Sequence, residues 1–222
     1  SSEPLRAMDT CICMGASISA GHGVQKAFEE NGVNKKVFAV IGDSTFFHSG
    51  ITGLMNIVYN KGNATTIILD NRITGMTGHQ ENPGTGYTLK GEKTQMIDIA
   101  KLCEGLGVKN IKTINPLDLK ETTEAIEEAM HVTEPMVIIA KWPCALKKLS
   151  SEEKQIYGDA KDKFYVDEDR CSGCKVCIRT GCPGIAFING KAYIDGISCV
   201  GCAVCQQVCR FGAIKRQGGE GK

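Results

Sequence analysis

The chain has no long apolar run and no strong excess of charge of either sign. None of its hydrophobic stretches approaches the roughly 20 residues that a membrane-spanning helix requires, so we expect no membrane span. The formal net charge is only +1, which gives no general attraction to nucleic acid or to a membrane surface. No low-complexity tract interrupts the 222 residues, of which 42% are hydrophobic. The chain is therefore long enough for a substantial core and for two domains.

Cysteine, in contrast, is abundant, and eight of the twelve cysteines lie between residues 171 and 209. They form two Cys-x-x-Cys-x-x-Cys triplets, each followed by a fourth cysteine. A zinc ribbon uses thiolates in pairs and a disulfide scaffold belongs to secreted chains, so triplets argue against both. The pattern resembles bacterial-type ferredoxins, in which the fourth cysteine of each run ligates the other cluster. The expected ligands are Cys171, Cys174, Cys177 and Cys209 for a first [4Fe-4S] cluster, and Cys182, Cys199, Cys202 and Cys205 for a second.

This cysteine segment departs from the usual ferredoxin run in two ways. Four residues, not three, separate Cys177 from Cys182, and Cys209 is followed by Arg210 instead of proline. Arg179 and Arg210 are therefore basic residues beside the expected clusters. They are open to three interpretations: they raise the cluster potentials, they face an acidic partner, or they are ordinary solvated surface charges.

The rest of the chain alternates between apolar strands and amphipathic helices. Continuous apolar strands separated by helices are typical of a parallel α/β sheet. One helix is expected to open with Asn115 as its N-cap and Pro116 as its first residue. Strands are expected at residues 37–41, 65–69, 108–112 and 136–140.

Polar residues follow the first two expected strands. Gly42-Asp43-Ser44 ends one strand and Asn71 ends the next, and the carboxyl ends of parallel strands meet at one edge of a sheet, where ligands collect. Asp43 offers an anionic oxygen and Asn71 a neutral one, as Mg²⁺ requires when phosphate oxygens complete its octahedron. Glycine at position 42 allows a diphosphate close to the backbone, and the helix expected after Ser49 directs its N-terminus toward the same place.

These segments resemble the diphosphate-binding domain of thiamine diphosphate enzymes, with Ser44 in place of the second glycine of the Gly-Asp-Gly motif. The runs GDSTFFHSG at residues 42–50 and NRITGMTGHQ at residues 71–80, with MGAS at residues 14–17, are similar to the alpha subunits of indolepyruvate:ferredoxin oxidoreductases. That family also carries a fused two-cluster ferredoxin tail. The resemblance covers nearly the whole chain.

The resemblance implies a set of cofactor ligands. Mg²⁺ would be bound by Asp43, Asn71 and the backbone carbonyl of Ile73. The residues implied near thiamine diphosphate are Gly15, Gly42, Asp43, Ser44, Thr45, Asn71, Gly75 and Thr77. His48 is a candidate for a substrate or proton-transfer role, although a capping or packing histidine fits its position equally well.

We therefore predict an α/β protein with a parallel-sheet thiamine diphosphate-binding domain and a small α+β two-[4Fe-4S] bacterial ferredoxin-like domain. The expected bounds are 1–145 for the first domain, 146–163 for a linker, 164–217 for the second domain and 218–222 for a loose tail. The four remaining cysteines, Cys11, Cys13, Cys103 and Cys144, are expected to be small core residues or incidental thiols. Because clusters do not survive oxidising compartments and no secretory leader is recognisable, we expect a soluble cytoplasmic protein.

The resemblance implies oxidative decarboxylation of an aryl 2-oxoacid to an acyl-coenzyme A, with electrons passed through two clusters to external ferredoxin. The alternatives are a pyruvate or other 2-oxoacid:ferredoxin oxidoreductase and, in another class, a non-catalytic electron-transfer module. In the family a pyrimidine-binding domain lies earlier in a longer chain, and a beta subunit is present. We therefore expect this chain to be an incomplete piece that is inactive alone and acts within a larger oligomer.

Overall fold

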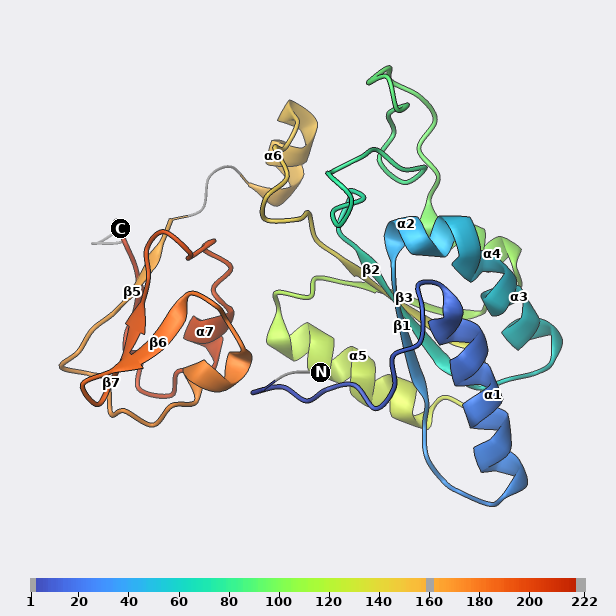
Figure 1. Cartoon of the computed structure of the whole chain (residues 1–222), viewed down its shortest axis with the longest axis horizontal. Helices are drawn as coiled ribbons and strands as arrows, with labels where there is room; N and C mark the ends of the chain where they lie inside the picture. Colours follow the sequence, from blue (N-terminus) through green and yellow to red (C-terminus); the bar gives the residue numbers. More distant parts are fainter. Residues whose placement is uncertain (1–2, 159–161, 219–222) are drawn as a thin grey trace. The chain divides into compact units, whose positions relative to one another are not determined.

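A computed structural model describes residues 3–158 and 162–218 of the chain. It divides the chain into two compact units (Figure 1). Residues 11–148 form one, called here the sheet unit, and the described residues 3–10, 149–158 and 162–218 form the other, called here the cysteine unit. Most of the expected loose tail, residues 219–222, lies outside the described residues, as do residues 159–161 of the expected linker.

The sheet unit is built on four parallel strands in the order β1-β2-β4-β3. Their bounds are Phe38–Gly42 for β1, Thr65–Asp70 for β2, Asn110–Ile114 for β3 and Met136–Lys141 for β4. All four match expected strands, although β3 begins two residues later than predicted. In register, Gly42 of β1 lies opposite Leu69 of β2. The residues that follow these two strands therefore emerge side by side.

Helices cover both faces of the sheet (Figure 1). The helical segments are α1 (Ala16–Glu30), α2 (Asp43–Thr45), the π-helical turn η1 (Phe46–Gly50), α3 (Ile51–Tyr59), α4 (Ile99–Gly105) and α5 (Leu119–His131). Side chains of α1, α3 and α4 pack into one core with alternate strand residues. Ala125 and Ala129 of α5 pack into a second core on the opposite strand positions, which include Ile138. Successive strand side chains point to opposite faces, so each strand contributes to both cores.

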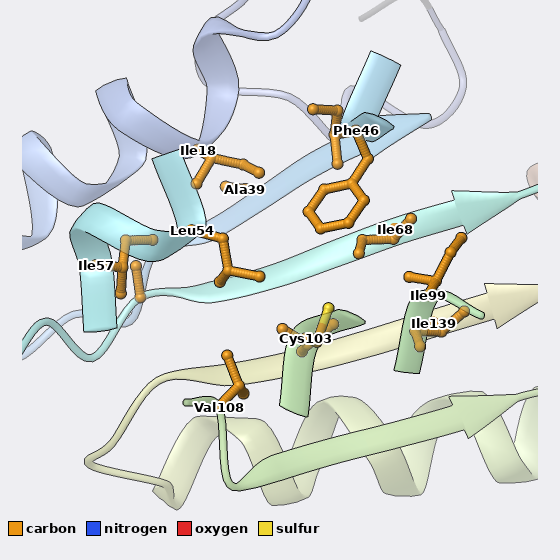
Figure 2. Close-up of a cluster of buried hydrophobic side chains, with 13 residues drawn as sticks. Ile18, Ala39, Phe46, Leu54, Ile57, Ile68, Ile99, Cys103, Val108 and Ile139 are labelled. Carbon is orange, nitrogen blue, oxygen red and sulfur yellow. The ribbon is translucent and has the colours of Figure 1, made fainter. Parts of the chain in front are cut away.

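Figure 2 shows the larger core, where Ile18, Leu54 and Cys103 come from three different helices and meet the strand residues Ile68 and Ile139. Ile18, Cys103 and Ile68 are completely buried. Burying one large aliphatic side chain stabilises a fold by roughly 1.5–3 kcal/mol. This core fixes α1 and the Asp43–Tyr59 helical segment against the first two strands, and so fixes the strand ends.

One expectation about a helix start was wrong, and another was incomplete. Asp118, not Asn115, caps α5, because its carboxylate accepts hydrogen bonds from the backbone N–H groups of Lys120 and Glu121. Asn115 instead closes the preceding turn by accepting from the N–H of Leu117 at 3.0 Å. The helix expected after Ser49 begins at Asp43, directly at the end of β1, and runs to Tyr59 through the π-helical turn. Single-turn π-helical insertions are frequent at functional sites.

The cysteine unit contains two small antiparallel sheets. Strand β5 (Phe164–Val166) pairs with β8 (Ile214–Arg216), and β6 (Ile185–Ile188) pairs with β7 (Lys191–Ile194). Short helical segments accompany them, namely α6 (Ser151–Tyr157), the 3-10 turn η2 (Cys177–Thr180) and α7 (Val204–Gln207). Five of the cysteines expected as ligands lie in its buried core or pack against it, together with Phe164 and Ile214. In the part of the chain that the structure describes, no helix has the length and hydropathy of a membrane span.

Candidate functional site

The ends of β1 and β2 bring the expected cofactor residues to one place. Asp43 follows Gly42 directly and is only 3% exposed. Asn71 follows Asp70, the last residue of the neighbouring strand. Because Gly42 and Leu69 are paired in register, Asp43 and Asn71 follow the ends of two adjacent strands at the carboxyl edge of the sheet, as the parallel arrangement predicts.

Burial destabilises the charged form of the Asp43 carboxylate. Desolvation raises its pKa above the ordinary value, because a buried charge loses its hydration. The N–H of Ser44 and the side chain of Asn82 act in the opposite direction, since both donate to the ionised form. Asn82 Nδ2 lies 3.1 Å from Asp43 Oδ2, and both side chains are buried. A cation beside Asp43 would stabilise the charged carboxylate.

Asn82 is a residue of this site that the sequence did not reveal. It lies 39 positions after Asp43, within the long loop that follows β2. The Asn-Pro-Gly sequence at residues 82–84 signals a turn, and the N–H of Gly84 does donate to Asn82 Oδ1 at 2.9 Å. That signal locates a turn, but it does not tell which strand end the turn packs against.

A second set of contacts attaches the same loop to the end of β2. Arg72 Nη1 donates to the carbonyl of Gly84 at 2.7 Å and lies 3.8 Å from Asp70 Oδ2. Both charged side chains of this pair are nearly buried. The Arg72 backbone N–H also donates to Asp70 Oδ1 at 3.1 Å. The loop from residue 71 to residue 98 is thus held at two points, Arg72 and Asn82, beside Asp43.

Asn71 is fixed by its own turn. Its Oδ1 accepts from the N–H of Ile73 at 3.1 Å, and its carbonyl accepts from the N–H of Cys144 at 2.9 Å. Gly75 approaches closely, since a Cβ built there would lie 3.6 Å from Asn71 Nδ2. Ile73 is buried beside this turn. The side chain that would ligate Mg²⁺ is therefore oriented before any ligand arrives.

Hydroxyl groups connect the loop to the start of the helical segment. Thr74 Oγ1 donates to Ser44 Oγ at 3.0 Å, which joins Ser44, a residue expected near the diphosphate, to the loop beside Gly75. Thr45 is buried, whereas Thr77 is exposed and donates to Gln80 Oε1 at 2.7 Å. His48 lies in the π-helical turn and is exposed.

Two glycines of the predicted set have different surroundings. Gly15 has φ +87°, and a Cβ there would overlap Ser49 Oγ, so the start of α1 must approach the helical segment without a side chain. Gly42 faces open space, because a Cβ built on it meets no atom within 4 Å. No protein atom therefore requires glycine at position 42, and the free space suits a phosphate group close to the backbone.

The donor set at this edge fits thiamine diphosphate with Mg²⁺. It offers a buried carboxylate whose pKa is raised, a pre-oriented amide oxygen at the end of the adjacent strand and free space at Gly42. These are hard oxygen ligands of the kind that Mg²⁺ selects when phosphate oxygens and water complete its coordination.

In the cysteine unit, the eight expected ligands line two separate cavities. One cavity of about 370 Å³, its open mouth included, is lined by Cys171, Cys174, Cys177 and Cys209. The other, of about 310 Å³, is lined by Cys182, Cys199, Cys202 and Cys205. The two groups of four are the two groups predicted from the spacing, including the exchange of the fourth cysteine between the halves.

The thiols of each group are crowded. Burial raises the pKa of Cys205 to about 12, and the nearby Cys202, Cys182 and Cys199 add to that rise. Burial also raises the pKa of Cys177, with Cys209 and Cys171 contributing. Among the described residues, no three His, Cys, Asp or Glu side chains are close enough to hold a single metal ion. Four thiolates around one cavity instead suit a polynuclear cluster, whose positive irons would compensate their charge.

The cysteine unit is an internal repeat with an offset of 28 residues, counted from Lys163 to Lys191. Residues 163–177 and 191–205 share the order Lys, Tyr, Asp, Cys, Gly, Cys, Val, Cys. The backbone repeats as well: Lys175 and Ala203 occupy equivalent positions, and both have φ +63°. Left-handed conformation is uncommon in residues other than glycine, so its recurrence at both positions shows that the two ligand loops share one backbone shape.

The paired lysines cross between the repeats. Lys191 Nζ donates to the carbonyl of Cys171 at 2.6 Å, and Lys163 Nζ donates to the carbonyl of Cys199. Each ammonium group therefore binds the first cysteine of the other repeat's triplet. Both cysteine groups receive one positive charge in this way.

Comparisons with known proteins assign the sheet unit to one class of protein. Residues 1–140 match the family model of the thiamine pyrophosphate enzyme, C-terminal TPP binding domain. The chain belongs to the thiamine pyrophosphate enzymes, and its sheet unit is their TPP-binding domain.

Within that class the chain is similar to indolepyruvate oxidoreductase subunit IorA. It is 38% identical to that subunit from Pyrococcus horikoshii and 39% identical to the one from Thermococcus kodakarensis, in each case over 96% of this chain. The chain spans about a third (34%) of the length of these relatives. The structure of a 2-oxoglutarate:ferredoxin oxidoreductase from Magnetococcus marinus matches with a TM-score of 0.55 and 18% identity, covering 64% of this chain and 50% of that one. At this identity the match shows a shared fold only.

Proposed function

We propose that this chain is part of a 2-oxoacid:ferredoxin oxidoreductase that converts an aryl 2-oxoacid, such as indolepyruvate, and coenzyme A into an acyl-coenzyme A. The observation that carries the proposal is the presence, on one chain, of a TPP-binding domain and two separate four-cysteine cavities. A decarboxylase or a carboligase has no use for one-electron acceptors. The arylpyruvate preference rests on the similarity to IorA.

In the sheet unit, Asp43, Asn71 and the carbonyl of Ile73 would hold Mg²⁺, and Ser44, Thr45, Gly75 and Thr77 would lie near the diphosphate. Thiamine diphosphate, when bound, supplies the electron sink for cleaving the bond between the carboxylate and the carbonyl carbon. Asn82 keeps the carboxylate of Asp43 in one orientation, because it donates to Oδ2 at 3.1 Å. The exposed His48 is free to meet substrate and stays a candidate for proton transfer.

In the cysteine unit, the two groups of four cysteines would hold two [4Fe-4S] clusters in a bacterial ferredoxin-like fold. The clusters supply two one-electron acceptors, which match the two electrons released by oxidative decarboxylation. The crossed Lys163 and Lys191 hold the backbone of the ligand loops, because they donate to the carbonyls of Cys199 and Cys171. The alignment with IorA supports this assignment because it extends over 96% of the chain.

The complete enzyme requires more than this chain provides. The chain corresponds to about a third of the relatives' length, so we infer that a pyrimidine-binding domain comes from another part of a longer subunit. A beta subunit, external ferredoxin and coenzyme A complete the proposed reaction, and we place the assembly in the cytoplasm. The isolated chain is then expected to bind its cofactors weakly and to show no turnover.

The test is an anaerobic assay of the complete complex with a panel of 2-oxoacids, coenzyme A and a viologen dye as acceptor. The expected result is coenzyme A-dependent dye reduction with the highest kcat/KM for indolepyruvate or phenylpyruvate. A preference for pyruvate or 2-oxoglutarate would favour the alternative 2-oxoacid:ferredoxin oxidoreductase. Decarboxylation without any dye reduction would contradict the proposal.

A second candidate is an electron-transfer module in which the sheet unit binds no cofactor. Calorimetric titration of the full-length subunit with thiamine diphosphate and Mg²⁺ separates the two. Saturable binding that requires Mg²⁺ supports the enzyme, and no binding supports the module.

A further inference from the structure

The two cysteine cavities differ in exposure. Around the first cavity, Cys174 is exposed, and so are its neighbours Lys175 and Val176. Around the second, each of the four cysteines is buried or half-buried. A cluster in the first cavity would therefore be closer to solvent, through the Cys174 sulfur, than a cluster in the second.

The two cavities also differ in charge, although their backbones repeat. Lys175 lines the first cavity, whereas its equivalent in the second is Ala203. Arg210 follows the fourth cysteine of the first group and is close enough for its charge to act on the Cys174 thiol. The residue that follows the fourth cysteine of the second group is Pro183. No charged residue lines the second cavity among the described residues.

Other charges near the first cavity balance. The turn before the first triplet carries Glu168 and Asp169, and the positive side chains beside it are Arg170 and Lys191, which donates to the Glu168 carbonyl at 3.0 Å. Near the second cavity, the crossed Lys163 is close enough to Asp195 for their opposite charges to interact. Among the charged residues that line either cavity or act on its thiols, the difference is therefore the positive pair Lys175 and Arg210.

Two aromatic side chains, Phe187 and Phe211, accompany this positive pair. Lys175 Nζ lies 4.4 Å from the centre of the Phe187 ring, which fixes the ammonium group over an aromatic face. Phe211 lines the first cavity and is 49% exposed. We define the Cys174 face as Cys174, Lys175, Val176, Phe187, Arg210 and Phe211. Aromatic side chains and arginine are enriched at protein-binding surfaces.

We propose that the Cys174 face is the docking site of an acidic one-electron acceptor protein, and that the cluster held by Cys171, Cys174, Cys177 and Cys209 is the exit point for electrons. This inference rests on the proposed function. In each transfer, the reduced cluster gives one electron to the acceptor, so that the cluster becomes oxidised and the acceptor becomes reduced. The buried cluster of the second cavity then reduces the first cluster again by giving it one electron.

Charge complementarity carries the choice of partner. Lys175 and Arg210 would attract a protein whose surface is negative around its own redox centre, and such steering raises association rates by roughly 10- to 1,000-fold at low ionic strength. The same two charges favour the reduced, more negative state of the first cluster over that of the second. Electrons would thus move toward the exposed cluster, where the acceptor docks.

The test compares two double variants of the full-length subunit in its complex. K175E/R210E reverses both charges on the Cys174 face. K109E/K120E is the matched control, because it changes the net charge equally at two strongly exposed lysines of the sheet unit, which are 78% and 86% exposed. The probe is a ferredoxin with a strongly negative net charge, and a small neutral quinone serves as an acceptor that needs no docking.

Two readouts are measured after iron content and electron paramagnetic resonance have shown equal cluster loading. The first is the Kd of the ferredoxin, and the second is the second-order rate of its reduction as a function of salt. We expect K175E/R210E to weaken binding and to slow ferredoxin reduction by at least about 10-fold at low salt, whereas quinone reduction, which senses only the shifted potential of the first cluster, changes much less. The control should behave like the parent protein.

Equal effects of the two double variants, or no effect of K175E/R210E, would overturn the docking site while leaving the proposed function intact. Equal slowing of ferredoxin and quinone reduction would also overturn it, because the substitutions would then act on the cluster and not on docking. A parent protein that assembles no clusters would overturn both the inference and the electron-transfer part of the proposed function.

Discussion

The two units build their sites from the sequence in different ways. In the sheet unit, the site combines Gly15, Asp43, Asn71 and Asn82, which are far apart in the chain and meet only because β1 and β2 are adjacent. In the cysteine unit, three ligands of each cavity come from a single seven-residue loop, and only the fourth comes from the other half. A site of the second kind is visible in the spacing of its residues, whereas a site of the first kind depends on the fold.

The units nevertheless share one electrostatic feature. Asp43 in the sheet unit and Cys177 and Cys205 in the cysteine unit are ligand candidates whose pKa is raised by burial. Each group is unfavourable in its charged form until a positive centre is present. The comparison therefore predicts that both units gain stability when their metals bind, by separate routes.

The largest expected effect comes from Cys205→Ser, which tests whether the units are independent. The substitution removes one thiolate from the second cavity, so we expect loss of about half of the bound iron and a less stable cysteine unit. Binding of thiamine diphosphate to the sheet unit should not change. Iron analysis and calorimetry of the full-length subunit measure both, with Cys144→Ser as the control. Loss of thiamine diphosphate binding in C205S would show that the units are coupled.

Asp43→Asn should have opposite effects on affinity and on stability. It removes the anionic ligand, so we expect the affinity for Mg²⁺ with thiamine diphosphate to fall by more than about 100-fold. Without cofactor, the variant should unfold at a higher temperature than the parent, because it buries no charge. Titration calorimetry and thermal melts check the two halves of this prediction. A lower melting temperature for the cofactor-free variant would contradict the account of Asp43.

The raised pKa of Asp43 also predicts how the stability of the sheet unit depends on pH. Its pKa is higher in the folded state than in the unfolded chain. Its contribution to stability is then fully present below the unfolded pKa and is lost as the pH rises through the folded pKa. Affinity for Mg²⁺ changes in the opposite sense and falls as the pH drops through the folded pKa, because the ligand must be ionised. D43N should abolish both dependences.

Asn82→Leu should have an intermediate effect on the sheet unit alone. Leucine has a similar size but cannot donate to Asp43 Oδ2, so Asp43 loses its orienting partner. Losing such a partner of a metal ligand typically costs 10- to 100-fold in metal affinity, and we expect a loss of that order for Mg²⁺. Asn110→Leu, which alters an amide at the start of β3, is the control. Equal affinities in N82L and the parent would remove Asn82 from the site.

The smallest effect is expected from the crossed lysines, and it tests the repeat within the cysteine unit. Lys191→Met should lower the potential of the first cluster, and Lys163→Met that of the second, each by tens of millivolts, because a nearby positive charge favours the reduced cluster. Redox titration followed by electron paramagnetic resonance measures the two potentials. Shifts of the same cluster in both variants would contradict the crossed arrangement.

The sequence predicted the features that depend on local patterns. The four strands and the grouping of the cysteines follow from runs of apolar residues and from the spacing of the triplets. Asn115 was wrongly taken as a cap because Asn-Pro is a common helix start, while Asp118, a stronger anionic acceptor, lay three residues further on. The sequence pattern also did not predict that the chain enters a helix directly after Gly42, since Asp43-Ser44 is equally typical of a turn.

The contacts between distant segments could not be predicted. Nothing in the residues around Asn82 indicates that it reaches Asp43, because the path of a loop of nearly thirty residues depends on anchors such as Arg72 and Gly84. The crossing of Lys163 and Lys191 likewise requires the two repeats to be packed together. Such contacts follow from tertiary packing, which a single sequence does not display.

The central claim is that the sheet unit and the cysteine unit form one electron path. The most direct measurement is rapid mixing of the complete, oxidised complex with a 2-oxoacid under anaerobic conditions, without an external acceptor. The account predicts that both clusters become reduced, seen as bleaching of their visible absorbance and as electron paramagnetic resonance signals, in step with release of CO₂. Release of CO₂ while both clusters stay oxidised would contradict it.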